Sequence, residues 1–94
     1  MAKDPNKRNL LHQPFEMQVE VLRNLKGGQQ AIVTSMPSES MHVGTFSEYV
    51  QKIAAELGAP IGDSASIPYY HKTQSHDNET QLIIGRRASL PPRR

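Results

Sequence analysis

The chain offers few residues from which to build a hydrophobic core. It has 94 residues, and its two ends, 1–13 and 86–94, are rich in charge and proline and lack apolar periodicity. Roughly 72 residues remain for a fold, and a domain of that size buries only about 60% of its unfolded surface. The sequence contains no cysteine, which excludes disulfides and cysteine-based zinc sites as added stabilisation. We therefore expect one small domain, either standing alone or stabilised by a homodimer or a bound partner.

The clearest local pattern predicts a helix over residues 45–57. Thr45 and Glu48 have capping-box spacing at its start. Gly58 supplies a left-handed stop, and Pro60 prevents continuation. The apolar residues between these signals recur at helical spacing on one face: Phe46, Tyr49, Val50, Ile53, Ala54 and Leu57.

Three other segments predict β-strands. Residues 66–74 and 80–87 alternate in polarity, and the polar connection 75–79 between them predicts a hairpin. Pro68 cannot donate to a neighbouring strand, so it marks an edge or a strand start. A further short strand is expected at 29–35.

Residues 15–25 fit two patterns. The apolar residues of 15–21 alternate with glutamate and glutamine as in a strand, whereas Phe15, Val19, Leu22 and Leu25 also form a helical stripe. The valines and the strict alternation favour the strand. The order β-β-α-β-β then predicts a two-layer α+β fold, a small antiparallel sheet with one amphipathic helix on one face. The expected core is Val19, Val21, Ile32, Val33, Phe46, Val50, Ile53, Leu57, Leu82 and Ile84.

The formal net charge of +2 hides a division along the chain. Residues 1–13 carry three basic and one acidic side chain, net +2, and residues 86–94 carry four arginines, net +4. Residues 14–85 carry four basic and eight acidic side chains, net −4. We expect a flexible basic arm at 1–13, a folded acidic domain at 14–87 and a flexible tail rich in proline and arginine at 88–94.

The sequence gives little support for an enzyme. Ser75-His76-Asp77 brings three catalytic residue types together, but adjacent residues in a turn cannot adopt triad geometry. The histidines and carboxylates of the 71–79 hairpin lack any established metal-binding spacing, and Gly27-Gly28 lacks the lysine and helix start of a phosphate loop. We expect a non-enzymatic protein with no cofactor and no metal.

Basic and aromatic side chains favour nucleic acid, DNA or RNA, as the partner. Tyr70 is expected to face outward in its strand beside Lys72, where it can stack a base. Arg86 and Arg87 directly follow the last strand, and arginine binds phosphate in a bidentate manner. Mobile basic ends add affinity that is independent of base sequence. The predicted nucleic-acid-binding residues are Lys3, Lys7, Arg8, Tyr70, Lys72, Arg86, Arg87, Arg93 and Arg94.

The acidic body supports a second hypothesis, a protein-interaction module. Such a module would inhibit a host enzyme or an immune complex by occupying a cationic site on it. The stretch LKGGQQAIV, the helix ending in Ala-x-x-Leu-Gly and the Tyr/Thr-rich hairpin resemble small uncharacterised phage and prophage accessory proteins over residues 22–86. The resemblance implies a small phage-borne regulator or inhibitor and transfers no functional residues.

The expected location is the cytoplasm. No run of about 20 apolar residues is present to span a membrane. The basic start at Lys3–Arg8 is not followed by the apolar segment of a secretion signal.

Overall fold

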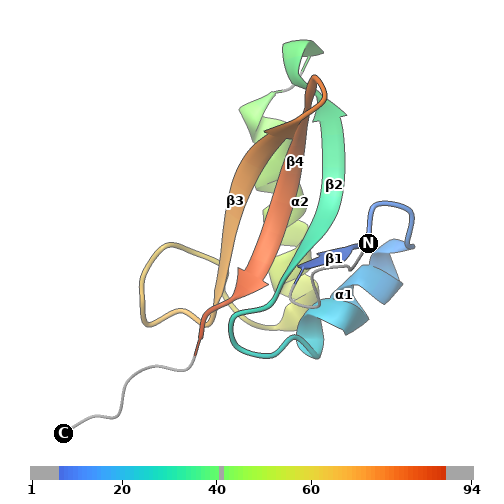
Figure 1. Cartoon of the computed structure of the whole chain (residues 1–94). Helices are drawn as coiled ribbons and strands as arrows, with labels where there is room; N and C mark the ends of the chain where they lie inside the picture. Colours follow the sequence, from blue (N-terminus) through green and yellow to red (C-terminus); the bar gives the residue numbers. More distant parts are fainter. Residues whose placement is uncertain (1–6, 41, 89–94) are drawn as a thin grey trace, which may run out of the picture.

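Four strands form one sheet, and two helices cover one of its faces (Figure 1). The computed structural model describes residues 7–40 and 42–88. Along the chain the elements are β1 (Lys7–Asn9), α1 (Phe15–Arg23), β2 (Gln30–Pro37), a 3-10 turn (Ser38–Ser40), α2 (Val43–Leu57), β3 (Tyr69–His76) and β4 (Glu79–Arg86). The predicted two-layer α+β class is confirmed, with a second helix that the sequence pattern did not predict.

The sheet is mixed, with the strand order β1-β2-β4-β3. The pairs β2/β4 and β3/β4 are antiparallel, and the second of them is the hairpin predicted from the sequence. β1 runs parallel to β2, so the prediction of a wholly antiparallel sheet is wrong. β1 also lies inside the segment 1–13 that was expected to be an arm. Leu10 explains its placement, because its side chain is buried in the core and its N–H donates to the Ile32 carbonyl.

The strand predicted at 15–21 is wrong, because this segment is the helix α1. Val19, Leu22 and Leu25 are buried along one helical stripe, whereas Met17, which the strand pattern would bury, is 49% exposed. Pro14 stands immediately before the helix, where its missing N–H costs nothing. Packing of the Leu22 side chain therefore outweighed the β propensity of the two valines.

The predicted helix at 45–57 is confirmed as α2, although it begins two residues earlier, at Val43. Thr45 and Glu48 do not form the predicted capping box, because the residue at the cap is His42 and no side chain bonds there. The stop is as predicted: Gly58 adopts φ 72° and donates its N–H to the Ala54 carbonyl. Phe46, Val50 and Ile53 face the sheet and are buried.

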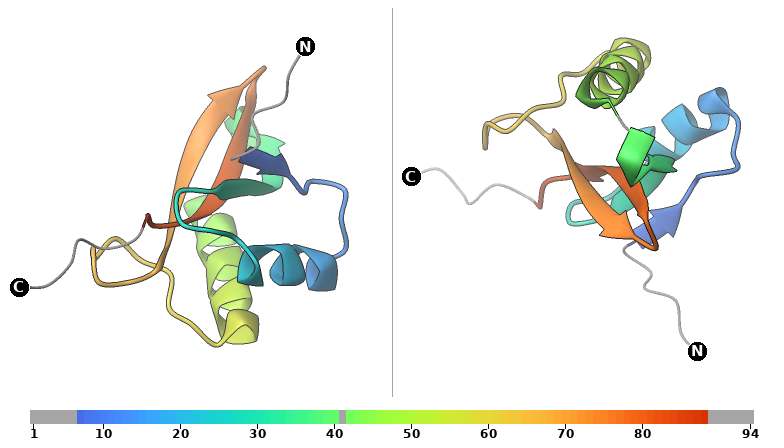
Figure 2. Two further views of the ribbon diagram at one scale, coloured as in Figure 1. Left: turned by 60° about the horizontal axis from the view of Figure 1, so that its bottom comes forward. Right: turned by 90° about the horizontal axis from the view of Figure 1, so that it is seen from above.

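The β3–β4 hairpin fixes which side chains face the helices. Asp77 and Asn78 have positive φ and form a tight two-residue turn. Side chains alternate along each strand, so Tyr69, Leu82 and Ile84 join the core on what we call the inner face. The opposite side of the sheet, the outer face, carries neither of the two described helices (Figure 2).

Candidate nucleic-acid interface

Charge divides between the two layers of the fold. The helices α1 and α2 carry four glutamates against Arg23 and Lys52, a net charge of −2. The four strands carry four cations against one carboxylate, a net charge of +3: Lys7, Arg8, Lys72 and Arg86 against Glu79. The acidic character expected for residues 14–85 therefore lies in the helices, the loops and the hairpin tip.

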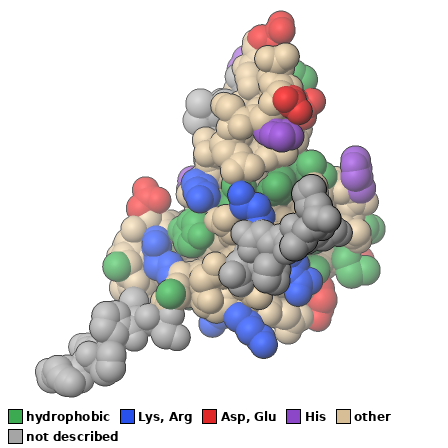
Figure 3. All heavy atoms as spheres, in the orientation of Figure 1, with side chains coloured by type: hydrophobic (Ala, Val, Ile, Leu, Met, Phe, Trp, Pro, Cys, Tyr) green, Lys and Arg blue, Asp and Glu red, His purple; other side chains and the backbone are tan. Residues whose placement is uncertain are grey.

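Figure 3 looks onto the outer face of the sheet. Blue lysine and arginine side chains lie over its lower half and along its lower edge, whereas red carboxylates lie at the hairpin tip and at the flanks. Lys7 is in register with Gln30, and Lys72 is in register with Ile83. Because both neighbours face outward, alternation places the two lysines on the outer face.

Tyr70 lies on the outer face, as predicted, but its ring and its hydroxyl already make contacts within the protein. The ring packs on Gly85, where an added Cβ would collide with the ring and its hydroxyl. Its hydroxyl donates to Gln30 Oε1 at 3.2 Å, and the Arg87 guanidinium lies 5.4 Å from the ring centroid. Tyr70 therefore fills the space above a glycine, and the ring face against Gly85 is closed to a base.

Arg87 holds a loop. Its Nε donates to the Ile67 carbonyl at 2.8 Å and its Nη2 donates to the Gly62 carbonyl at 2.6 Å. Its backbone N–H donates to the Pro68 carbonyl. Two of its five side-chain N–H donors are thus committed to loop carbonyls, while its charge remains uncompensated by any carboxylate in the described residues.

Arg86 is directed to the other side of the sheet. Its guanidinium lies 5.4 Å from the Tyr69 ring centroid, and its Nη1 is 3.4 Å from the Tyr69 hydroxyl, a weak contact. That hydroxyl donates to the Leu22 carbonyl near the end of α1. Within residues 7–40 and 42–88, no carboxylate lies within ion-pair distance of Arg86. A half-buried guanidinium without an anionic partner is a ready contact for phosphate.

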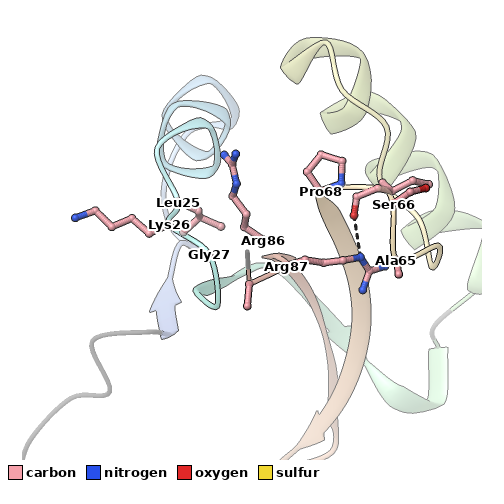
Figure 4. A pocket seen from close by; sticks show the side chains of 10 residues that line it. Leu25, Lys26, Gly27, Ala65, Ser66, Pro68, Arg86 and Arg87 are labelled. Atoms are coloured by element: carbon pink, nitrogen blue, oxygen red, sulfur yellow. Dashed lines mark hydrogen bonds between the residues drawn. The ribbon is translucent and has the colours of Figure 1, made fainter. Parts of the chain in front are cut away.

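Arg86 and Arg87 both line a cavity of about 480 Å³ at the end of β4, which we call the strand-end cavity. Its other walls come from the turn at 25–27 and the loop at 65–68. In Figure 4 Arg86 points toward α1, Arg87 points toward the 65–68 loop, and Lys26 points away from both. Consecutive strand residues face opposite ways, so the two arginines do not act together on one phosphate.

The structure brings together only part of the predicted site. Lys7, Tyr70 and Lys72 share the outer face, and Arg86 lies at the strand-end cavity. Arg8 is exposed in β1 in register with Ala31, whose side chain belongs to the core, so it is on the other face. Lys3, Arg93 and Arg94 lie outside the described residues.

Sequence reasoning missed Lys26 and Gln30. Both come near the site through pairing between distant segments, since the Gly28 N–H donates to the Arg86 carbonyl and the Tyr70 hydroxyl reaches Gln30. The only local signal for Lys26 was the neighbouring Gly27-Gly28 turn, and a turn pattern does not indicate that this segment lies beside the end of β4.

The residues considered for catalysis are exposed. His76 Nε2 and Asp77 Oδ2 are 3.4 Å apart at the hairpin tip, where both side chains are largely in solvent. In the described part of the chain, no three histidine or carboxylate side chains lie close enough to hold a metal ion. No described helix combines the length and the apolar character needed to cross a membrane.

Comparisons with family models, curated proteins and solved structures found no match to this chain. The resemblance to phage accessory proteins therefore stays a prediction from sequence, and function has to be argued from the geometry above.

Proposed function

We propose that this protein binds single-stranded nucleic acid on the outer face of its sheet, without reading base sequence. The observation that carries the proposal is a pair of exposed lysines, Lys7 and Lys72, on the sheet face that no described helix covers, whereas the helix layer on the other face has a net charge of −2. Phosphate groups are attracted to the layer with the cations, and counterions released from them supply the binding free energy.

The absence of sequence readout follows from where the helices lie. Proteins that read bases in duplex DNA commonly insert a helix into the major groove. Here α1 and α2 pack on the inner face and carry net negative charge, so they are poor groove readers. The outer face instead offers lysines and side-chain amides on a sheet, an arrangement suited to an extended single strand.

The contacts on this face have distinct roles. Lys7 and Lys72 are exposed point charges for phosphate. Gln74 lies farther along the same face, half-buried and donating to the buried Gln81 at 2.6 Å, and offers a polar contact to a base. Arg86 is directed to the other side of the sheet and takes a phosphate at the strand-end cavity, at the end of β4. Basic residues at both ends of the chain add to the same attraction.

Fluorescence anisotropy with a labelled oligonucleotide at several salt concentrations tests the proposal. We expect log Kd to depend linearly on log salt concentration, with a slope of about 0.7 for each single-strand phosphate that the protein neutralises. Lys72→Gln should weaken binding and reduce the slope by about that amount, and adding Lys7→Gln should reduce it by about the same again. A duplex of equal length should bind more weakly than the single strand.

Lys52→Gln is the matched control. It removes the same charge from an exposed lysine, but in the helix layer. Lys52 lies 4.6 Å from the Phe15 ring centroid, so circular dichroism should accompany the titration. Equal effects of the Lys52 and Lys72 substitutions would contradict an outer-face site. No binding by the intact protein at low salt would reject the proposal.

The acidic helix layer supports a second candidate function, a module that docks on a cationic protein surface. Glu16, Glu20, Glu48 and Glu56 all lie in α1 and α2 and are exposed. This function becomes the leading one if nucleic acid does not bind, and substitutions in the helix layer would then abolish capture of the target.

A further inference from the structure

β3 is an edge strand, eight residues long, with one side unpaired by any described strand. It lies at the margin of the sheet opposite β1 (Figure 2). The Tyr69 carbonyl accepts from the Gly62 N–H at 3.0 Å on that side, which covers the first residue. Backbone groups of an antiparallel strand alternate in direction, so the N–H and C=O groups of His71, Thr73 and Ser75 also point outward from the sheet.

These outward groups have no backbone partner among the residues that the structure describes. Proteins commonly protect such an edge with short length, proline or several charges. The other edge strand, β1, has that protection, being three residues long with two adjacent cations. β3 has a single lysine and neither proline nor carboxylate within its bounds.

The sequence of β3 is complementary to itself. In an antiparallel pair of two copies centred on Thr73, Thr73 lies opposite Thr73 and His71 lies opposite Ser75. These are the residues with outward backbone groups, so each such pair can exchange two hydrogen bonds. Lys72 then lies opposite Gln74. Centring the pair on Lys72 would instead place two lysines face to face, which is destabilising.

A groove beside the edge supplies apolar surface. It has a volume of about 470 Å³, lies between α2 and β3, and is lined by Phe46, Val50, Ile61 and Leu82, with His71 and Thr73 on the strand side. A second copy paired on β3 would place its own α2 across this groove. Closure of the groove would then add buried apolar area to the backbone hydrogen bonds.

We infer that two copies of this chain associate through β3, antiparallel about Thr73, to form one continuous eight-stranded sheet. The unpaired edge of β3, its self-complementary register and the groove beside it all favour this dimer, whether or not the protein binds nucleic acid. In the dimer the two outer faces adjoin and both Lys72 side chains lie on one surface, so a single strand of nucleic acid can contact both copies.

Sedimentation equilibrium of the full chain without nucleic acid tests the inference. At about 100 µM, well above a Kd of about 10 µM, most chains should be dimeric, and the average mass of wild type should approach twice the 10.5 kDa of one chain. Thr73 is exposed, so Thr73→Lys and Thr73→Asp should fold but each remain monomeric, because like charges meet at the centre of the interface. An equimolar mixture of the two variants should regain the dimer mass.

Thr45→Lys is the control, because it makes the same change at an exposed position on α2. It should leave the dimer mass unchanged, and circular dichroism should be the same for all variants. A monomeric wild type would overturn the inference. So would a dimeric Thr73→Lys variant, and so would a mixture of the two charged variants that stays monomeric.

Discussion

Gln18, on α1, links β2, α2 and the segment that follows β1 through one buried side chain. It is 2% exposed, and its Nε2 donates to the Leu10 carbonyl at 2.6 Å and to the Val33 carbonyl at 2.9 Å. Its Oε1 accepts a hydrogen bond from the Tyr49 hydroxyl on α2. Val33 lies where the register of β2 against β4 shifts. The amide therefore supplies a partner to a carbonyl at the irregular point of the sheet.

Replacing Gln18 with leucine should destabilise the protein by about 1–3 kcal/mol, because a buried carbonyl and a phenol lose their partner. The Leu10 carbonyl is spared, since it also accepts from the Gln13 N–H. Urea unfolding at fixed protein concentration measures the change. Gln13→Leu, the same substitution at an exposed position, is the control, and equal costs for the two variants would show that the network adds nothing.

Tyr49 makes stability depend on alkaline pH. Burial raises the pKa of its phenol above the usual value of 10.0, because the charged form loses solvation. Because the phenol has a higher pKa in the folded than in the unfolded state, its neutral form favours the folded state. This stabilisation is fully present below the unfolded pKa and is lost as pH rises through the folded pKa. Between about pH 9 and pH 11, wild type should therefore lose more unfolding free energy than Tyr49→Phe. If wild type and Tyr49→Phe lost the same unfolding free energy over this pH range, that result would contradict this role.

At the scale of elements, α2 was predictable and α1 was not. The apolar stripe and the stop at Gly58 indicate the same helix from the sequence, and the residues of that stripe are the ones that the structure buries wholly or in part. In α1 the strand and helix patterns share Phe15 and Val19, and the decision rests on Leu22, which is fully buried. Which alternative buries more apolar surface depends on β1 and β2, whose places in the sheet the local sequence does not specify.

Ile53 anchors α2 to the rest of the core and is fully buried. Ile53→Ala should lower the free energy of unfolding by about 2–5 kcal/mol, since it removes apolar packing and leaves a cavity. That loss is a large part of the total for a domain of this size. Chemical denaturation measures it, with the exposed neighbour Lys52→Ala as control. A loss of unfolding free energy below about 1 kcal/mol would mean that residues other than Ile53 hold α2 against the core.

At the scale of the whole molecule, the linear charge count was correct but incomplete. A net −4 over residues 14–85 suggested an acidic body, whereas folding adds to the sheet three cations that the count had assigned to the ends of the chain, Lys7, Arg8 and Arg86. Arg86 and Arg87 are adjacent in sequence, and alternation directs Arg86 toward α1 and Arg87 toward the 65–68 loop (Figure 4). Both results depend on pairing between distant segments, which residue order alone does not reveal.

The strand order has a consequence for synthesis on the ribosome. β4 lies between β2 and β3, and it is translated after both of them. Until β4 emerges, β2 lacks its antiparallel partner and β3 has no described strand beside it. Until β4 has been made, both strands in the nascent chain are therefore open to wrong partners. Long-range pairing of this kind also slows folding, so this protein is most exposed to wrong pairing in the interval between the synthesis of β2 and that of β4.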